Sequence, residues 1–274
     1  MITRLQLDLS GFGIDLTTAD GALAEDVARR WSGFARAPGS PAALHVEVED
    51  VPAALPEGAF GDKSIVVRRV GGAFEIRMPE GCARVGCDGQ IRIGVPRGTV
   101  EERAFAVDNV LLAALALALP ERGACLLHAA AAVIGGEAVI FLGGEGAGKS
   151  TWAGHAAARG AVVLSDDLVF VAAGGGAVLA LASPFRAERN PGARSTSFPV
   201  RAVLVPERAR AHALDRLGVL RSVAAVTAGL MYECAGTSRA ARETAEAVAR
   251  AVPVLRFRFA PDPGWIDLLR RARI

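Results

Sequence analysis

The chain has 274 residues, 51% of them apolar, and its 31 basic and 29 acidic side chains give a formal charge of +2. A chain of this length and composition can bury a core as one large domain or as two modest ones. The nearly balanced charge gives no reason to expect a nucleic-acid partner or an anionic membrane surface.

Residues 1 to about 100 are predicted to form a β-rich region with one helix. The helix covers residues 21 to about 34, because Leu23, Val27 and Trp31 recur at helical spacing. Short apolar segments predict strands at residues 4–9, 43–48, 64–70, 74–78 and 91–95. The Gly71-Gly72 pair predicts a two-residue hairpin turn. No cluster of reactive side chains occurs in this region, so we expect it to serve substrate recognition or assembly.

A different pattern begins near residue 101, and we place a domain boundary there, between residues 1–100 and 101–274. Helices are expected at residues 101–119, 150–159, near 216–229 and 237–251, with a short helix at the end. Strands are expected at 124–134, 137–142, 161–164, 168–172, 177–181, 201–205 and 254–259. This alternation predicts an α/β protein in which a smaller α+β region precedes a larger region with a mixed sheet.

The first residues and the most apolar stretch do not suggest export or a membrane span. The first residues lack the charged segment, apolar core and cleavage site of a secretion signal. The most apolar stretch, residues 110–120, is shorter than the roughly 20 residues that cross a bilayer. We therefore expect a cytoplasmic protein with no membrane partner.

A glycine-rich loop carries the strongest chemical signal. It fits G-x-x-x-x-G-K-[ST], lies between an apolar strand and a helix-forming stretch, and is followed by Thr151; its residues are Gly143, Gly144, Glu145, Gly146, Ala147, Gly148, Lys149 and Ser150. Such a loop turns backbone N–H groups toward phosphate oxygens, while Lys149 would bridge the outer phosphates and Ser150 would hold Mg²⁺. A glycine-rich hairpin or helix cap could spell the same letters, but lysine occurs only at positions 63 and 149. The motif therefore predicts a phosphate-binding site.

Two adjacent carboxylates, Asp166 and Asp167, follow the apolar strand at residues 161–164. The end of a strand beside a phosphate loop is where a metal-holding carboxylate and a general base are needed. Neighbouring side chains of an extended chain point to opposite faces, so the two residues need not share a role. The alternative interpretation is a helix cap or a turn.

His128 is brought to the loop by strand register. If Gly135-Gly136 is a two-residue turn, paired positions sum to 271, and His128 then lies opposite Gly143, where the loop opens. An imidazole at this position could orient a carboxylate or help to move a proton. The alternative is a core histidine satisfied by a backbone carbonyl.

Residues 126–167 resemble the catalytic core of the HPr serine kinase/phosphorylase family, whose fold is shared with phosphoenolpyruvate carboxykinase. That family has a histidine 21 residues before the loop lysine and an acidic pair that ends about 18 after it, and here 149 − 128 = 21 and 167 − 149 = 18. The resemblance implies a P-loop core that uses ATP and Mg²⁺. It further implies that Asp167 deprotonates an accepting serine, with His128 and Asp166 in support.

The sequence also departs from that family. We find no Glu-Ile-Arg-Gly type loop carrying a second metal ligand; in the segment 184–190, Glu188 could face the metal and Arg186 or Arg189 the phosphate, or the segment could be a solvated charged loop. The first hundred residues are unlike the bacterial HPr kinase N-terminal domain, and Thr151 replaces a glutamate common in the family. The overall plan is more similar to HPr-kinase-like proteins of natural-product clusters, some of which phosphorylate the C-terminal serine of lasso-peptide precursors.

These observations favour a kinase that transfers the γ-phosphate of ATP to a serine hydroxyl of a peptide or protein. Two other readings remain: a kinase of the same fold with a small-molecule acceptor, and an ATP-gated peptide-binding module without turnover. The family's tendency to assemble makes a homo-oligomer a further expectation. The sequence does not identify the acceptor.

Overall fold

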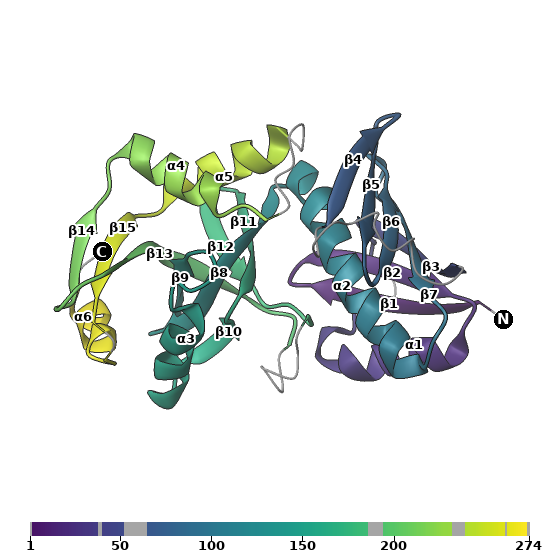
Figure 1. Ribbon diagram of the computed structural model, residues 1–274, viewed down its shortest axis with the longest axis horizontal. Coiled ribbons are helices and arrows are strands. Elements are labelled where there is room, and N and C mark those ends of the chain that lie inside the picture. The colour runs from purple at the N-terminus through teal and green to yellow at the C-terminus, as the bar shows by residue number, and fades with distance from the viewer. Residues whose placement is uncertain are drawn as a thin grey trace.

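The computed structural model describes residues 2–37, 40–51, 65–185, 194–231, 239–260 and 262–272. Two mixed β-sheets lie side by side, and six α-helices of the described residues pack against them (Figure 1). The predicted α/β class with a mixed sheet is confirmed. Among the described helices, none is both long enough and apolar enough to span a membrane.

The first sheet has seven strands in the order β1-β2-β3-β7-β6-β5-β4. Their bounds are β1 Thr3–Leu9, β2 Phe12–Thr18, β3 Leu44–Val51, β4 Val66–Val70, β5 Ala73–Met78, β6 Gly81–Val85 and β7 Gln90–Pro96. The central pairs β2–β3 and β3–β7 are parallel, and the outer pairs are antiparallel hairpins. The Gly71-Gly72 turn is confirmed, since Val70 pairs with Ala73. Strands β2 and β6 were not predicted.

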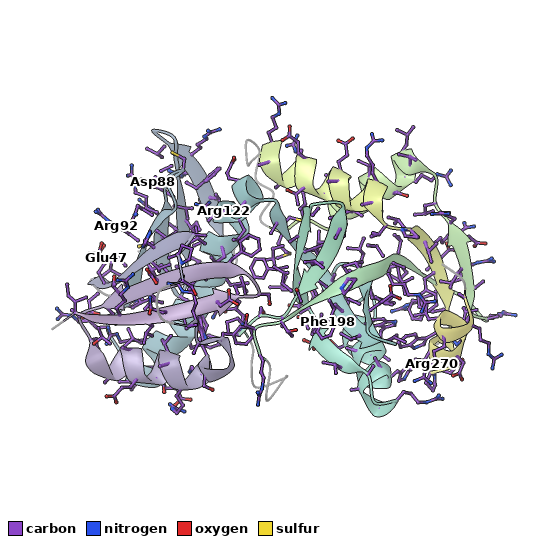
Figure 2. The ribbon with its side chains drawn as sticks, turned by 180° about the vertical axis from the view of Figure 1, so that it is seen from behind. Glu47, Asp88, Arg92, Arg122, Phe198 and Arg270 are labelled. Carbon is purple, nitrogen blue, oxygen red and sulfur yellow. The ribbon has the colours of Figure 1, made fainter. Side chains whose placement is uncertain are left out.

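One face of the first sheet is buried and the other is exposed to solvent. Along β3 the burial alternates residue by residue, which is what the period of two in a strand produces. On the exposed face, Glu47 pairs across the strands with Arg92 at 3.5 Å (Figure 2). Helices α1, Gly21–Arg30, and α2, Val100–Ala118, cover the buried face. The helix predicted for residues 21 to about 34 is shorter than expected. It ends at Arg30, and a 3₁₀ turn, Ser32–Phe34, follows it.

Both of these helices begin at side-chain caps. The carboxylate of Asp20 accepts the backbone N–H of Leu23 at 3.1 Å and caps α1. At the start of α2, Thr99 and Glu102 form a reciprocal capping box. The accepted N–H and the Arg103 guanidinium lower the pKa of Asp20, and the Thr99 N–H lowers the pKa of Glu102.

The second sheet has eight strands. They are β8 Ala124–Ile134, β9 Glu137–Leu142, β10 Val162–Ser165, β11 Leu168–Gly174, β12 Ala177–Leu181, β13 Ser197–Arg208, β14 Ala213–Arg216 and β15 Val254–Phe259. The pairing runs from β8 to β9, β13, β12 and β11, and β11 returns to β8, so these five strands close into a ring. Strands β13 and β15 are parallel, and β14 completes that edge. Strand β14 was not predicted, and β13 is longer than expected.

Helices cover both sides of the second sheet (Figure 1). Helix α3, Lys149–Ala158, and helix α6, Trp265–Arg271, pack on one side, where Trp152 stacks on Trp265 with ring centroids 4.9 Å apart. Helix α4, Val219–Ala228, and helix α5, Arg239–Ala251, pack on the other side. The predicted helix at 216–229 therefore starts only at Val219, after β14.

The two sheets share an apolar core. Helix α2 packs against β5, β6 and β7, and the same cluster of buried side chains includes Leu126 of β8, Phe170 of β11 and Leu181 of β12. Arg122, just after α2, donates to the carbonyl oxygens of Ala43 at 3.1 Å and Ala118 at 3.0 Å (Figure 2). The predicted boundary near residue 100 stays a prediction, but α2, which follows it in sequence, packs on the first sheet.

Candidate active site

The glycine-rich loop joins the end of β9 to the start of α3. Gly143 has φ +153° and Gly148 has φ +93°, in the region that L side chains rarely adopt. A Cβ on Gly143 would lie 2.5 Å from the Cβ of Ala147, so a larger residue would push the loop open. Gly148 caps α3, and Trp152 N–H donates to its carbonyl oxygen at 2.9 Å. The local sequence therefore produces a compact loop at a helix N-terminus, the geometry that favours anions.

Lys149 is the first residue of α3, and its side chain folds back over the loop. Its ammonium group donates to the carbonyl oxygens of Gly143 and Gly144, each at 2.9 Å, and lies 2.7 Å from Nε2 of His128. The residue is only 7% exposed. All three ammonium protons therefore have neutral partners, and the nearest carboxylate oxygen, Oδ1 of Asp167, is farther away at 3.6 Å.

His128 reaches the loop from β8, and Asp167 from the short connection between β10 and β11. The pairing of β8 with β9 has the predicted register, with Ile134 opposite Glu137 and Ala129 opposite Leu142. The backbone N–H of Gly143 donates to the carbonyl oxygen of His128 at 3.2 Å, so the predicted approach of His128 to the loop is found. On the other side of β8, Ala129 N–H donates to the Asp167 carbonyl oxygen at 2.9 Å. Backbone pairing thus holds both residues beside the loop.

A single imidazole nitrogen lies between a cation and an anion. Nε2 of His128 is 3.0 Å from Oδ1 of Asp167 and 2.7 Å from Nζ of Lys149. A neutral ring nitrogen either accepts from the ammonium or donates to the carboxylate, so it satisfies one of these neighbours at a time. A movement of Lys149 toward a bound anion would free Nε2 to donate to Asp167. The three side chains therefore form a coupled set.

An open cleft of about 670 Å³ lies over the loop. It is lined by His128, Glu145, Gly146, Ala147, Gly148, Lys149, Ser150, Thr151, Asp167 and Arg208. Asp166 is half-buried, lies beside Asp167 in the bend between β10 and β11, and does not line the cleft. Gly143 and Gly144 do not line the cleft, but their carbonyl oxygens accept hydrogen bonds from the Lys149 ammonium. Glu188, Arg186 and Arg189, proposed from the sequence as metal and phosphate ligands, lie outside the described residues.

The sequence alone did not indicate Arg208, which lines the cleft from the end of β13. Its Nη2 donates to the carbonyl oxygen of Gly146 at 3.2 Å. Strand β13 pairs in parallel with β9, so the carboxyl ends of both strands meet at the loop. The only signal in the sequence was an arginine at the end of an apolar strand, and its relevance depends on a parallel pairing that local patterns do not reveal.

The residues of the cleft fit a nucleotide with its magnesium ion. The loop offers backbone N–H groups, a helix N-terminus and a buried ammonium to phosphate oxygens, and a Cβ would block the turn at Gly143. Ser150 is exposed in the cleft. No group of three or more His, Cys, Asp or Glu side chains gathers as a metal site in the described part of the chain. Mg²⁺ needs no such group, since it takes one or two protein ligands together with phosphates and water.

Comparisons with known proteins add little. No protein-family model matches the sequence, and no curated protein matches it. Among solved structures, the chain is similar to the Hpr(Ser) kinase/phosphatase from Coxiella burnetii, with 13% sequence identity over 53% of this chain and 93% of that one and a TM-score of 0.32. A likeness at that TM-score carries no weight by itself, so the functional conclusion rests on the geometry of the cleft.

Proposed function

We propose that the protein is an ATP-dependent kinase that transfers the γ-phosphate to a serine hydroxyl of a peptide or protein. The observation that carries this proposal is the meeting of Lys149, His128 and Asp167 at a glycine loop that opens a helix, inside a cleft large enough for a triphosphate. A carboxylate and an imidazole beside a phosphate loop supply what phosphoryl transfer to a hydroxyl requires. A module that only binds nucleotide needs neither.

In the proposed step, the serine Oγ–H bond breaks and the proton passes to the carboxylate of Asp167. A bond forms between Oγ and the γ-phosphorus, while the bond from phosphorus to the bridging oxygen breaks and ADP leaves with those electrons. Lys149 stabilises the negative charge on the phosphoryl oxygens. Once Lys149 has moved to the phosphates, Nε2–H of His128 can donate to Asp167 and orient it toward the acceptor.

The magnesium ion, when bound, would neutralise phosphate charge and align the oxygens for in-line transfer. Ser150 is the residue of the cleft placed to hold it. Asp166, the second ligand predicted from the sequence, does not line the cleft. Ser150 is therefore the first metal ligand to test.

The resemblance of residues 126–167 to HPr serine kinases supports a seryl acceptor, and the similarity to kinases of lasso-peptide precursors supports a peptide with serine at or near its C-terminus. We propose to offer synthetic peptides of this kind and small-molecule alcohols to the protein in separate reactions with MgATP. Mass spectrometry then reports phosphate on each acceptor. Phosphate on small alcohols alone would exclude the peptide acceptor.

The test of the chemistry is Asp167→Asn, which keeps the size of the side chain and removes its ability to take a proton. We expect the transfer rate to fall by about 10²–10⁴-fold, the usual contribution of a general base. The affinity for MgADP, measured by calorimetry, should change by less than about threefold because the nucleotide contacts remain. Transfer by D167N at the wild-type rate would show that Asp167 is not the base.

A further inference from the structure

The cleft has two charged walls with opposite signs, on either side of β9. His128 and Asp167 come from β8 and from the connection between β10 and β11, on one flank of β9. Arg208 comes from the end of β13, on the other flank. Lys149 also lines the cleft, with its ammonium 3.6 Å from the Asp167 carboxylate. The carboxylate is therefore separated from the guanidinium by the width of the loop.

Arg208 is placed to bind a ligand as well as the loop. It is exposed in the cleft, and its guanidinium donates from Nη2 to the carbonyl oxygen of Gly146. A guanidinium has five N–H donors in a planar fork that matches two phosphate oxygens, so one bond to a carbonyl leaves donors for an anion. The guanidinium contacts Gly146, in the middle of the loop. Asp167, which would meet the acceptor, lies on the opposite flank of β9.

We infer that Arg208 binds the diphosphate part of the nucleotide, the part that leaves as ADP, and so sets the direction in which the triphosphate lies in the cleft. The inference rests on the proposed function. Arg208 attracts the diphosphate part to one side of the loop, and the terminal phosphate is then left for Lys149, beside Asp167, on the other side. Glu145 also lines the cleft, and the charge of Arg208 offsets its repulsion of phosphate.

The experiment compares wild type, Arg208→Gln and Arg208→Lys in calorimetric titrations with MgADP and with MgATP. Because Arg208 binds the part common to both nucleotides, R208Q should weaken both by the same factor, about tenfold, and R208K by less because it keeps the charge without the fork. The loss of affinity should also appear as a higher KM for MgATP in the transfer reaction.

Arg256→Gln is the matched control. Arg256 lies on the neighbouring strand β15 and is exposed. Its Nη2 donates to Asp215 at 3.2 Å, and it does not line the cleft. We expect R256Q to bind both nucleotides as wild type does. Circular dichroism melting of each variant checks that the exposed substitution has left the fold intact.

Salt dependence separates phosphate contact from simple support of the loop. If Arg208 touches phosphate, the affinity of R208Q for MgADP should fall less steeply with salt than that of wild type, whereas a loop-supporting role leaves the slope unchanged. An unchanged slope, equal binding by R208Q and wild type, or a loss confined to MgATP would each overturn the role of Arg208 while leaving the proposed kinase intact. Failure of wild type to bind either nucleotide would overturn both.

Discussion

The two halves of the molecule each hold a buried cation beside a cleft, and the partners of the two cations differ. In the first half, a cleft of about 590 Å³ lies where β2 and β3 end, next to the start of α1. Arg103 of α2, only 8% exposed, forms ion pairs there with Asp20 and Asp50. In the second half, Lys149 has two carbonyl oxygens and an imidazole as its nearest partners.

This difference separates a structural cation from one that can bind a substrate. Two carboxylates neutralise Arg103, so its charge is used to join α2 to the start of α1 and the end of β3. The nearest partners of Lys149 satisfy its protons, and with a single carboxylate at 3.6 Å, that of Asp167, its charge is less fully neutralised than that of Arg103 and stays available for an anion. The comparison predicts that replacing Lys149 impairs function, whereas replacing Arg103 impairs stability.

The largest effect expected from this comparison is that of Lys149→Met, which keeps an unbranched chain in the buried site and removes the charge. We expect kcat/KM for phosphoryl transfer to fall by about 10²–10³-fold, as when one preorganised donor to a transition-state anion is lost. MgATP affinity should fall as well. Transfer assays and calorimetry measure the two effects, and a K149M variant that binds MgATP as wild type does would contradict the comparison.

A smaller effect, on stability, is expected for Arg103→Met. Removing a buried ion-pair partner strands its carboxylates, but Asp20 and Asp50 are partly exposed, with 33% and 46% of their side chains accessible, so water compensates in part. We expect a loss of about 2 kcal/mol in the free energy of unfolding, measured in urea. MgADP affinity should be unchanged under conditions where R103M is folded, and a specific loss of nucleotide binding would show that the halves are coupled through this cation.

Local sequence predicted the pairing of β8 with β9 well because a two-residue turn determines its register. With Gly135 and Gly136 both at positive φ, β8 and β9 can pair in only one way, and His128 is then carried to the loop. The ends of both strands were predicted to the residue. The strand before the acidic pair was recognised from its apolar residues, while the roles assigned to Asp166 and Asp167 stay predictions.

What local sequence did not predict depends on tertiary pairing. Strand β2 was missed because its hairpin turns through Ser10-Gly11, where Ser10 adopts φ +49°, a conformation that serine rarely takes. Arg208 was missed because only the parallel pairing of β13 with β9 brings it to the cleft. Parallel neighbours are separated by long connections, and nothing in either strand specifies the other.

The smallest expected effect is a change in acid stability at the first cleft. The Leu23 N–H and Arg103 lower the pKa of Asp20 in the folded chain below the usual value of 3.8. The stability contributed by this carboxylate is therefore fully present above its unfolded pKa and is lost as the pH falls through the lower, folded value. Asp20→Asn can still cap α1 but does not titrate, so we expect its melting temperature to fall less steeply than that of wild type below about pH 4.

Thermal melts from pH 7 to pH 3 test this prediction. The control is Asp88→Asn, at the turn before β7, which replaces another carboxylate that accepts a backbone N–H. If the melting temperatures of wild type and D20N fall in parallel with pH, the charge of Asp20 does not stabilise its ion pair with Arg103. Asp50 would then be the only carboxylate that neutralises Arg103 in the comparison with Lys149.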